Sequence, residues 1–328
     1  EKSLLSLIER TTWDIPADVD KAIVQATKVE EAGTNGHAAL EEIGQAIDRA
    51  RLTKTILGSD PVALHFTVDG PVDLDRPAFE AAARSAAHAA AAEGWIRTPM
   101  IDLPSGKPRR GQDFGVIPTV RFRESDGGIR VHLWMRGPGE VGIASVATIP
   151  SPIAPGEPTI EGAGRVAVHA IHETQGRSGG PGIVGVHIGA DPIEGFAHAA
   201  DQILRPVGSK NPQRALTKVE EKITLDASQL GVGPQGLGGR TTILAAHLSV
   251  SEVPKDRWTV SVLMSSWACR RQSITLDKGG AIATWDSALA ETSYCTPLEP
   301  EVIEEPPPVK KKRAKKKTAP KAAVETSD

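Results

Sequence analysis

Large apolar residues recur at two spacings along this chain, and the shorter spacing indicates strands. Residues 62–68 alternate between large apolar and smaller or polar side chains, the period of a half-buried strand. The runs 183–188, 242–248 and 258–264 are apolar almost throughout, so we predict a strand in each, the third being the last apolar strand. Residues 114–135 predict two further strands joined at Asp126-Gly127-Gly128 by a hairpin-type turn.

The longer spacing, of three and four residues, indicates helices. Asp14 and Pro16 start a helix, because the missing N–H of proline costs nothing in the first turn. Apolar positions at helical spacing follow as far as Val29 and restart over 40–47 after a break at 33–36. Further helices are predicted over 75–92, 161–174, 191–204 and 218–230, and the four prolines of 148–158 predict an extended loop.

The overall composition is that of a globular protein able to bury a sizeable core. Hydrophobic residues make up 39% and charged residues 24% of 328 residues, which excludes a disordered or fibrous chain as a whole. No stretch approaches the roughly 20 apolar residues of a membrane span, and the first residues lack a signal-peptide pattern. Cys269 and Cys295 are the only cysteines, which argues against a disulfide framework and fits a reducing cytoplasm.

One loop, residues 231–242, holds five glycines and a proline within nine residues. It contains a literal G-x-G-x-x-G pattern at Gly231, Gly233 and Gly236. A dinucleotide site needs a strand before such a loop and a helix after it. Here the predicted helix comes first and the predicted strand second. We therefore expect a loop that lets backbone segments approach closely, and no nucleotide.

Three motifs in a fixed order carry a family resemblance. They are Pro181-Gly182-Ile183-Val184-Gly185-Val186, then Leu204-Arg205-Pro206-Val207-Gly208 with Asn211-Pro212, then the loop from Gly233 to Thr242. In this order they resemble the alpha region of the iron–sulfur hydro-lyases, the class I fumarate hydratases and L-tartrate dehydratases. The likeness covers roughly residues 4–275 and is strongest over 179–271. It implies an α+β fold and hydro-lyase chemistry.

The resemblance implies a four-iron cofactor held by three cysteines, with the fourth iron open to substrate as a Lewis acid. The position of the first cysteine falls on Gly58, the second on Gly179 and the third on Ser266. All three thiolates are therefore missing. A family histidine upstream of the third cysteine falls on Pro254, and the lysine–triglycine motif reads Arg136-Gly137-Pro138-Gly139. We expect no cofactor in this chain.

Several polar residues of the family motifs survive. The resemblance makes Asp60 a candidate acid or base and the others candidate contacts for a small dicarboxylate, because a guanidinium fork matches a carboxylate. The candidate substrate contacts are Arg136, Gln235, Arg240 and Arg270. Arg270 is the best candidate because it keeps the family's spacing from the third cysteine position, whereas Arg136 stands in place of the family's lysine and is more simply explained as a surface charge.

Other residues could hold a metal, and each has a plainer interpretation. His169 and His172 stand at i, i+3 spacing, but no third ligand is evident, so we favour a half-exposed helix face. His88 is expected to be a partly buried packing residue. Cys269, Cys295 and one histidine could in principle replace the cluster ligands; alternatively, Cys269 is a small apolar filler beside Trp267.

The last 28 residues differ from the rest of the chain. Residues 301–328 carry eight basic and five acidic groups, whereas residues 1–300 are net acidic. This composition predicts a disordered tail, 297–328, after a folded domain, 1–296. The basic run could contact nucleic acid non-specifically or an acidic partner, or could be a solvated extension. Its cations are Lys310, Lys311, Lys312, Arg313, Lys315, Lys316 and Lys317.

We therefore expect a diverged hydro-lyase alpha homologue that has lost its cluster and is non-catalytic or repurposed. Two alternatives stay open. One is an active hydro-lyase working with a separate beta subunit or another metal, since the family's beta half has no counterpart in the sequence. The other is an interaction protein acting through the basic tail. A homo-oligomer is compatible with each of these.

Overall fold

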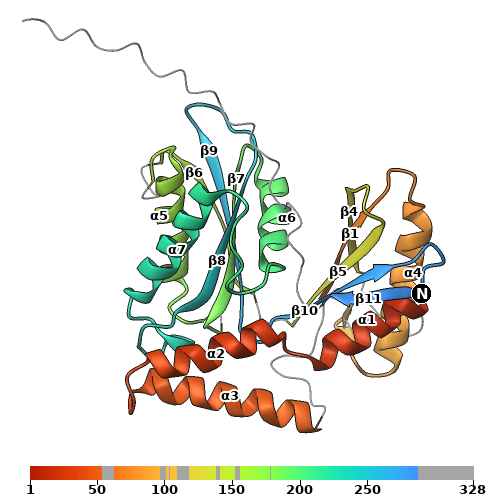
Figure 1. The fold of residues 1–328 in the computed structure, drawn as a ribbon, viewed down its shortest axis with the longest axis horizontal. Helices are drawn as coiled ribbons and strands as arrows, with labels where there is room; N and C mark the ends of the chain where they lie inside the picture. The colour runs from red at the N-terminus through yellow and green to blue at the C-terminus, as the bar shows by residue number, and fades with distance from the viewer. Residues whose placement is uncertain are drawn as a thin grey trace, which may run out of the picture. The chain divides into compact units, whose positions relative to one another are not determined.

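The chain divides into two compact units, Glu1–Thr296 and Pro297–Asp328. The computed structural model describes residues 1–53, 63–96, 101–102, 104–108, 118–137, 141–151, 156–177 and 179–286. The predicted basic tail, Asp60, Gly58 and Cys295 thus lie outside the described residues. Within the first unit, helices accompany two mixed sheets, so the predicted α+β class is confirmed (Figure 1).

Three helices begin the chain: α1 (Lys2–Trp13), α2 (Ala17–Val29) and α3 (Asn35–Thr53). The second starts directly after Pro16, as predicted, and the third follows the predicted break. Val19 and Ile23 of α2 pack against Leu40 and Ile43 of α3 in one buried cluster. The first helix, α1, was not predicted from the sequence.

Sheet A has one apolar face and one polar face. Its strand order is β11-β10-β5-β1-β4. The apolar face packs against α1 and α4 through Leu64, Phe66 and Val68, the residues whose alternation predicted β1. Asp75 begins α4 by accepting a hydrogen bond from the backbone N–H of Ala78. The elements are β1 (Ala63–Gly70), α4 (Arg76–Ala92), β4 (Thr119–Glu124), β5 (Ile129–Arg136), β10 (Arg270–Leu276) and β11 (Ile282–Asp286).

The predicted hairpin between β4 and β5 is wrong. Both strands exist, but β1 lies between them, parallel to β4 and antiparallel to β5. Their short connection therefore crosses one strand of the sheet. The apolar pattern of a strand determines which of its faces is buried, but it does not determine which strands lie beside it, because those can come from distant parts of the sequence.

Sheet C is covered by helices on both faces. Its order is β6-β9-β7-β8, with β7 parallel to β8 and antiparallel to β9. Helices α5 and α7 cover one face and α6 the other (Figure 1). Burial on both sides explains why β7 is apolar at nearly every position. The elements are β6 (Val141–Ile149), α5 (Ile160–Glu173), β7 (Gly182–Gly189), α6 (Pro192–Ile203), α7 (Arg214–Ser228), β8 (Ile243–Val250) and β9 (Trp258–Ser265).

One sequence expectation near sheet C needs correction, and another needs an addition. Thr148 and Ile149 close strand β6, so the predicted proline-rich loop begins later than expected. The strand over 258–264 is the last long apolar one, as expected, but two strands that the sequence did not predict, β10 and β11, follow it and complete sheet A. Neither holds a long apolar run, because β10 is mostly polar and β11 has only five residues. Two two-residue strands, β2 (Ile101–Asp102) and β3 (Lys107–Pro108), pair with each other.

Among the described residues, no helix has the length and apolar character that crossing a bilayer requires.

Candidate functional site at one end of sheet C

Segments far apart in sequence meet at one end of sheet C. A Cβ atom added to Gly179, just before β7, would lie 3.4 Å from the Cβ of Ser266, just after β9. The glycine loop reaches the same place, where the backbone N–H of Gln235 donates to the carbonyl of Gly180 at 3.1 Å. The structure therefore brings two of the three cluster positions and the loop together.

The glycine loop is held closed by the protein's own groups. A Cβ on Gly176 would lie 2.3 Å from the Cα of Gly236, so side chains are excluded where these backbones touch. Glu30, 7% exposed, accepts hydrogen bonds from the backbone N–H groups of Arg240 at 2.8 Å and Thr241 at 2.6 Å. These donors, which could have served an anionic ligand, are already used. The glycine loop thus brings backbone segments into close contact, as expected from the sequence.

The two described cluster positions do not fit a thiolate-held cluster. Gly179 has no side chain, and its φ of +66° is a left-handed conformation that a cysteine rarely adopts. Ser266 offers a hydroxyl, 4% exposed, whose oxygen has no hydrogen-bond partner among the described residues. A neutral alcohol is a poor substitute for the soft thiolate that iron–sulfur clusters take.

Cys269 does not complete a metal site with the residues described. It is fully buried beside Trp134 and Leu263, and its backbone N–H closes a turn on the carbonyl of Ser266 at 3.1 Å. Trp267, the expected neighbour, packs elsewhere, against the cluster that contains Ile183. Within the described ranges, no three side chains of histidine, cysteine, aspartate or glutamate gather closely enough for a metal ion. His169 and His172 are both exposed on α5.

The register of β10 against β5 separates two of the predicted arginines. Arg270 stands opposite Met135, and directly opposite residues share one face of a sheet. Arg136, one residue after Met135, therefore belongs to the other face. Arg270 is 1% exposed on the apolar face, so the two guanidinium groups do not converge.

Arg136 belongs to a small aromatic and cationic cluster that the sequence did not indicate. Its Nε donates to Nε2 of His65 at 2.9 Å, and its guanidinium carbon lies 5.6 Å from the centre of a Trp134 ring. Burial, helped by the positive charge of Arg136, lowers the pKa of His65 to about 4. The imidazole is therefore a neutral acceptor that orients the Arg136 guanidinium at neutral pH.

Gln235 and Arg240 are exposed on the glycine loop. Gln235 has a positive φ of 53° within a single 3₁₀ turn. Arg240 lines a hollow of about 590 Å³ together with Glu31 and Thr34, where the loop faces the α2–α3 connection. No hydrogen bond or ion pair among the described residues joins Arg240 to Arg136 or Arg270. The predicted contacts thus occupy separate places.

Sequence reasoning also missed a buried ionic network on the polar face of sheet A. Arg123 donates to both oxygens of Asp69, at 2.6 and 2.9 Å, and His132 contacts the same carboxylate at 3.0 Å. Burial alone would raise the pKa of Asp69, but the hydrogen bonds from His132 and Arg123 lower it below its usual value. Arg121 pairs in turn with Asp201 of α6. Charged residues alternating along β4 were the available signal.

Comparison with known proteins agrees with this architecture. Residues 1–275 match the family model described as fumarate hydratase (Fumerase). The chain is 28% identical over 297 residues to the "Putative fumarate hydratase class I" of Geobacillus stearothermophilus, covering 87% of this chain and 56% of that relative. It is 30% identical over 94 residues to the L(+)-tartrate dehydratase subunit alpha of Escherichia coli K12, covering 29% of this chain and 31% of the relative.

The chain thus spans about half the length of the first relative and a third of the second. The family match covers far more than half of this chain, including both sheets up to β10. The order of motifs, the meeting of Gly179, Ser266 and the glycine loop, and the match itself lead to one conclusion. This chain belongs to the fumarate hydratase family.

Proposed function

We propose that this chain is a diverged member of the fumarate hydratase family that holds no iron–sulfur cluster, is non-catalytic or repurposed, and binds a small dicarboxylate. The observation that carries the proposal is the meeting of Gly179 and Ser266. Neither position offers a thiolate, and the corresponding Cβ positions lie 3.4 Å apart.

The short distance between these two Cβ positions is a second argument for loss of the cluster, in addition to the absence of the cysteine sulfur atoms. Cβ atoms about 3.5–4.5 Å apart are typical of two cysteines joined by a disulfide, whereas a cluster needs its thiolates on different irons. Cysteine at 179 would also have to take up a left-handed backbone, at a cost of roughly 1–2 kcal/mol. Restored cysteines would therefore face each other rather than a metal.

A dicarboxylate remains a reasonable ligand because Arg240 and Arg270 survive from the family motifs and Arg136 puts a guanidinium group in place of the family's lysine. Arg136 is the best placed, since it is half-buried, oriented by His65 and stacked on Trp134. Arg270 is buried and would need local opening, while Gln235 and Arg240 are accessible on the loop. We propose Arg136 as the main carboxylate contact, with Asp60 as the acid or base in any residual catalysis.

A second candidate is an active hydro-lyase that works with another polypeptide. One relative is named as an alpha subunit, and this chain spans about half the length of the other. A beta-type subunit would then be the partner and would supply the rest of the site. The contact of the basic tail with nucleic acid stays a prediction from sequence.

The test is expression of the full chain without oxygen, followed by measurement of iron and sulfide and of two reactions, the hydration of fumarate and the dehydration of tartrate, with the chain alone and with a beta-type subunit. We expect no stoichiometric cluster and neither reaction. A brown protein with four irons per chain would overturn the proposal, and either reaction only with the beta-type subunit would establish the second candidate.

Dicarboxylate binding needs its own measurement. Calorimetry with fumarate and malate should show binding that Arg136→Gln weakens about tenfold, the loss of one charged hydrogen-bonding partner. Arg84→Gln, at an exposed position of α4, is the matched control and should bind as the unmodified chain does. Equal binding by both variants would remove Arg136 from the site.

A further inference from the structure

Strand β8 is an edge strand of sheet C, and the direction of its backbone groups can be assigned. The N–H of Ser251 donates to the carbonyl of Ile188 at 2.9 Å, so Ser251 faces the neighbouring strand β7. Successive residues of a strand point their N–H and C=O groups to opposite sides. Leu248 and Ala246 therefore point both groups away from the sheet.

Side chains cap the outward groups of Leu248. Its N–H donates to Oε1 of Glu220 at 2.7 Å, and its carbonyl accepts from Nδ2 of Asn211 at 2.7 Å. Arg205 holds Glu220 in place through a 2.6 Å contact. Unpaired edge groups attract other strands, and covering them is a common protection. Leu248 is the residue of this edge whose backbone groups these side chains cap.

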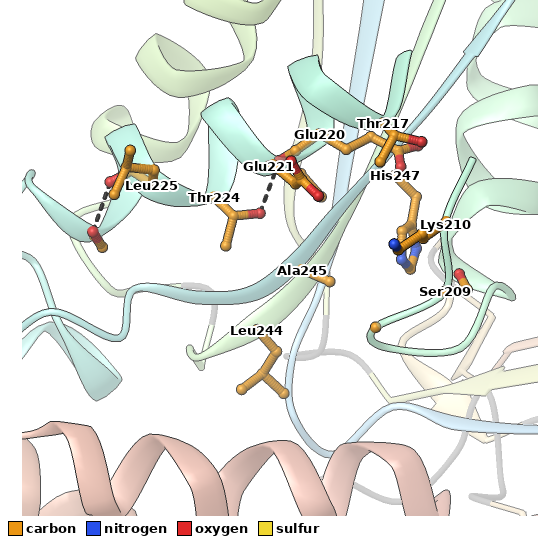
Figure 2. A pocket seen from close by; sticks show the side chains of 13 residues that line it. Ser209, Lys210, Thr217, Glu220, Glu221, Thr224, Leu225, Leu244, Ala245 and His247 are labelled. Carbon is orange, nitrogen blue, oxygen red and sulfur yellow. Dashed lines mark hydrogen bonds between the residues drawn. The ribbon is translucent and has the colours of Figure 1, made fainter. Parts of the chain in front are cut away.

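Ala246, two residues earlier, has no such cover. Among the described residues, nothing hydrogen-bonds to its outward N–H or C=O, and the residue is 3% exposed. Buried backbone groups without partners are costly and uncommon. A groove of about 500 Å³ opens beside this stretch, with α7 on one side and the 208–210 loop on the other (Figure 2).

The walls of the groove offer charge and hydroxyl groups. Glu221 on α7 and Lys210 on the loop are both exposed, and neither forms an ion pair within the part of the chain that the structure describes. Thr224, which lies between Glu221 and Leu225 along α7 in Figure 2, donates its hydroxyl to the carbonyl of Glu220 and can still accept a hydrogen bond. His247 donates through Nδ1 to the carbonyl of Gln202, and burial lowers its pKa to about 3.

We propose that this groove binds a short extended peptide, which adds to the edge of β8 at Ala246 and places a basic side chain on Glu221. One residue of an extended peptide presents a backbone C=O and a backbone N–H, spaced so that they can pair with the outward N–H and C=O of Ala246. A volume of about 500 Å³ is within the range of ligand sites. The carboxylate of Glu221 selects the basic side chain, and Lys210 repels a second cation at the other wall.

The experiment uses the full chain and two fluorescein-labelled, end-blocked pentapeptides of sequence Thr-Val-Lys-Val-Thr and Thr-Val-Glu-Val-Thr. Fluorescence anisotropy should show the lysine peptide binding about tenfold more tightly than the glutamate peptide. Methylation of its backbone amides should abolish binding, because the added strand then lacks donors. Hydrogen exchange at the Ala246 amide should slow about tenfold with the lysine peptide, while Leu248 is unchanged.

Glu221→Gln should remove the preference for lysine, whereas Glu42→Gln, at an exposed position of α3, should leave it intact. Circular dichroism checks that both variants keep their fold. No binding of either peptide at millimolar concentration overturns the proposal. It is equally overturned by unchanged exchange at Ala246, or by equal binding of methylated and unmethylated peptides.

Discussion

Sheets A and C use the same kinds of strand pairing, and each packs one apolar face against helices, but their other faces bury different kinds of polar group. In sheet C the face toward α5 and α7 is apolar, and the face toward α6 buries neutral polar side chains such as His187, Ser249 and Ser261. Sheet A has apolar contacts on one face, while the other carries the Asp69, His132 and Arg123 network. Close packing holds sheet C to its helices, whereas paired charges join sheet A to α6.

Close apolar packing and buried ion pairs respond differently when a side chain is replaced. An apolar interface loses contacts gradually as side chains shrink, and it cannot expand without strain. A buried ion pair fails abruptly when one partner is removed, because the other charge stays buried. The two sheets should therefore respond to different substitutions.

The largest effect is expected from Asp201→Ala. Asp201 is 3% exposed and pairs with Arg121 and, more loosely, with Arg123. Its removal takes away the carboxylate partner of Arg121, whereas Arg123 keeps its two hydrogen bonds to Asp69. We expect a loss of about 3 kcal/mol in unfolding free energy, at the lower end because Arg121 is 29% exposed and can rehydrate. Urea unfolding measures it; a loss under 1 kcal/mol would show that the network is dispensable.

Gly185→Ala should cost about 2 kcal/mol by overpacking sheet C against α6. A Cβ atom at 185 would lie 1.9 Å from the carbonyl oxygen of Ala199, so helix and strand must separate. Gly44→Ala on α3, where nothing lies within 4 Å, is the control and should stabilise by about 0.5–1 kcal/mol. Similar urea midpoints for both variants would contradict the close approach.

Acid should destabilise the protein through His65. Its folded pKa is about 4, below the unfolded value near 6.5, so the unfolded chain takes up the proton first as pH falls. The stability is fully present above pH 6.5 and is lost progressively toward pH 4, by on the order of 2 kcal/mol. His65→Gln should make this part of a stability–pH curve less steep, while His187 and His247, whose pKa values are lowered to about 3, keep the remaining slope. An unchanged slope would refute the assignment.

The same curve distinguishes the two sheets. His247, in sheet C, has a pKa lowered to about 3 by burial and Arg205, so its contribution continues to be lost below pH 4. In the His65→Gln variant, the loss of stability below pH 4 should therefore remain.

Glu30→Gln should loosen the glycine loop by about 1 kcal/mol. The neutral amide still accepts from the N–H groups of Arg240 and Thr241, but the bonds lose their charge assistance. Hydrogen exchange at those two amides should rise about fivefold, the equilibrium equivalent of that energy. Unchanged exchange would mean that glycine packing alone closes the loop.

The smallest effect is expected from Ser266→Ala. The hydroxyl is buried without a hydrogen-bond partner among the described residues, so removing it should change stability by less than about 0.5 kcal/mol in either direction. Thermal unfolding measures this. A large loss would show that the hydroxyl has a partner, such as a bound ligand, at this end of sheet C.

Local signals in the sequence predicted individual elements well. Alternation gave β1, unbroken apolar runs gave β7, β8 and β9, and Asp75 and Asp191 gave the starts of α4 and α6. Such signals act within one turn or one strand. Strands β10 and β11 were missed. Strand β10 is rich in polar residues and pairs with β5, far away in sequence, and β11 has only five residues, none fully buried, and pairs in turn with β10.

The candidate site was predictable only in part. The order of motifs identified the family and named Gly179, Ser266 and the glycine loop. Neither the clamp of Glu30, some 210 positions before Arg240, nor the support of Arg136 by His65 left a local pattern. Both contacts arise from side chains that meet only after folding.

The sequence by itself determined the helix caps, the apolar faces of the strands and membership of the fumarate hydratase family, because these depend on residue type and spacing. Only the tertiary structure decided that β1 separates β4 from β5, that Arg136 and Arg270 occupy opposite faces, and that Gly179 meets Ser266. Strand order and register follow from pairing over long separations, which a local pattern constrains to a face but not to a partner.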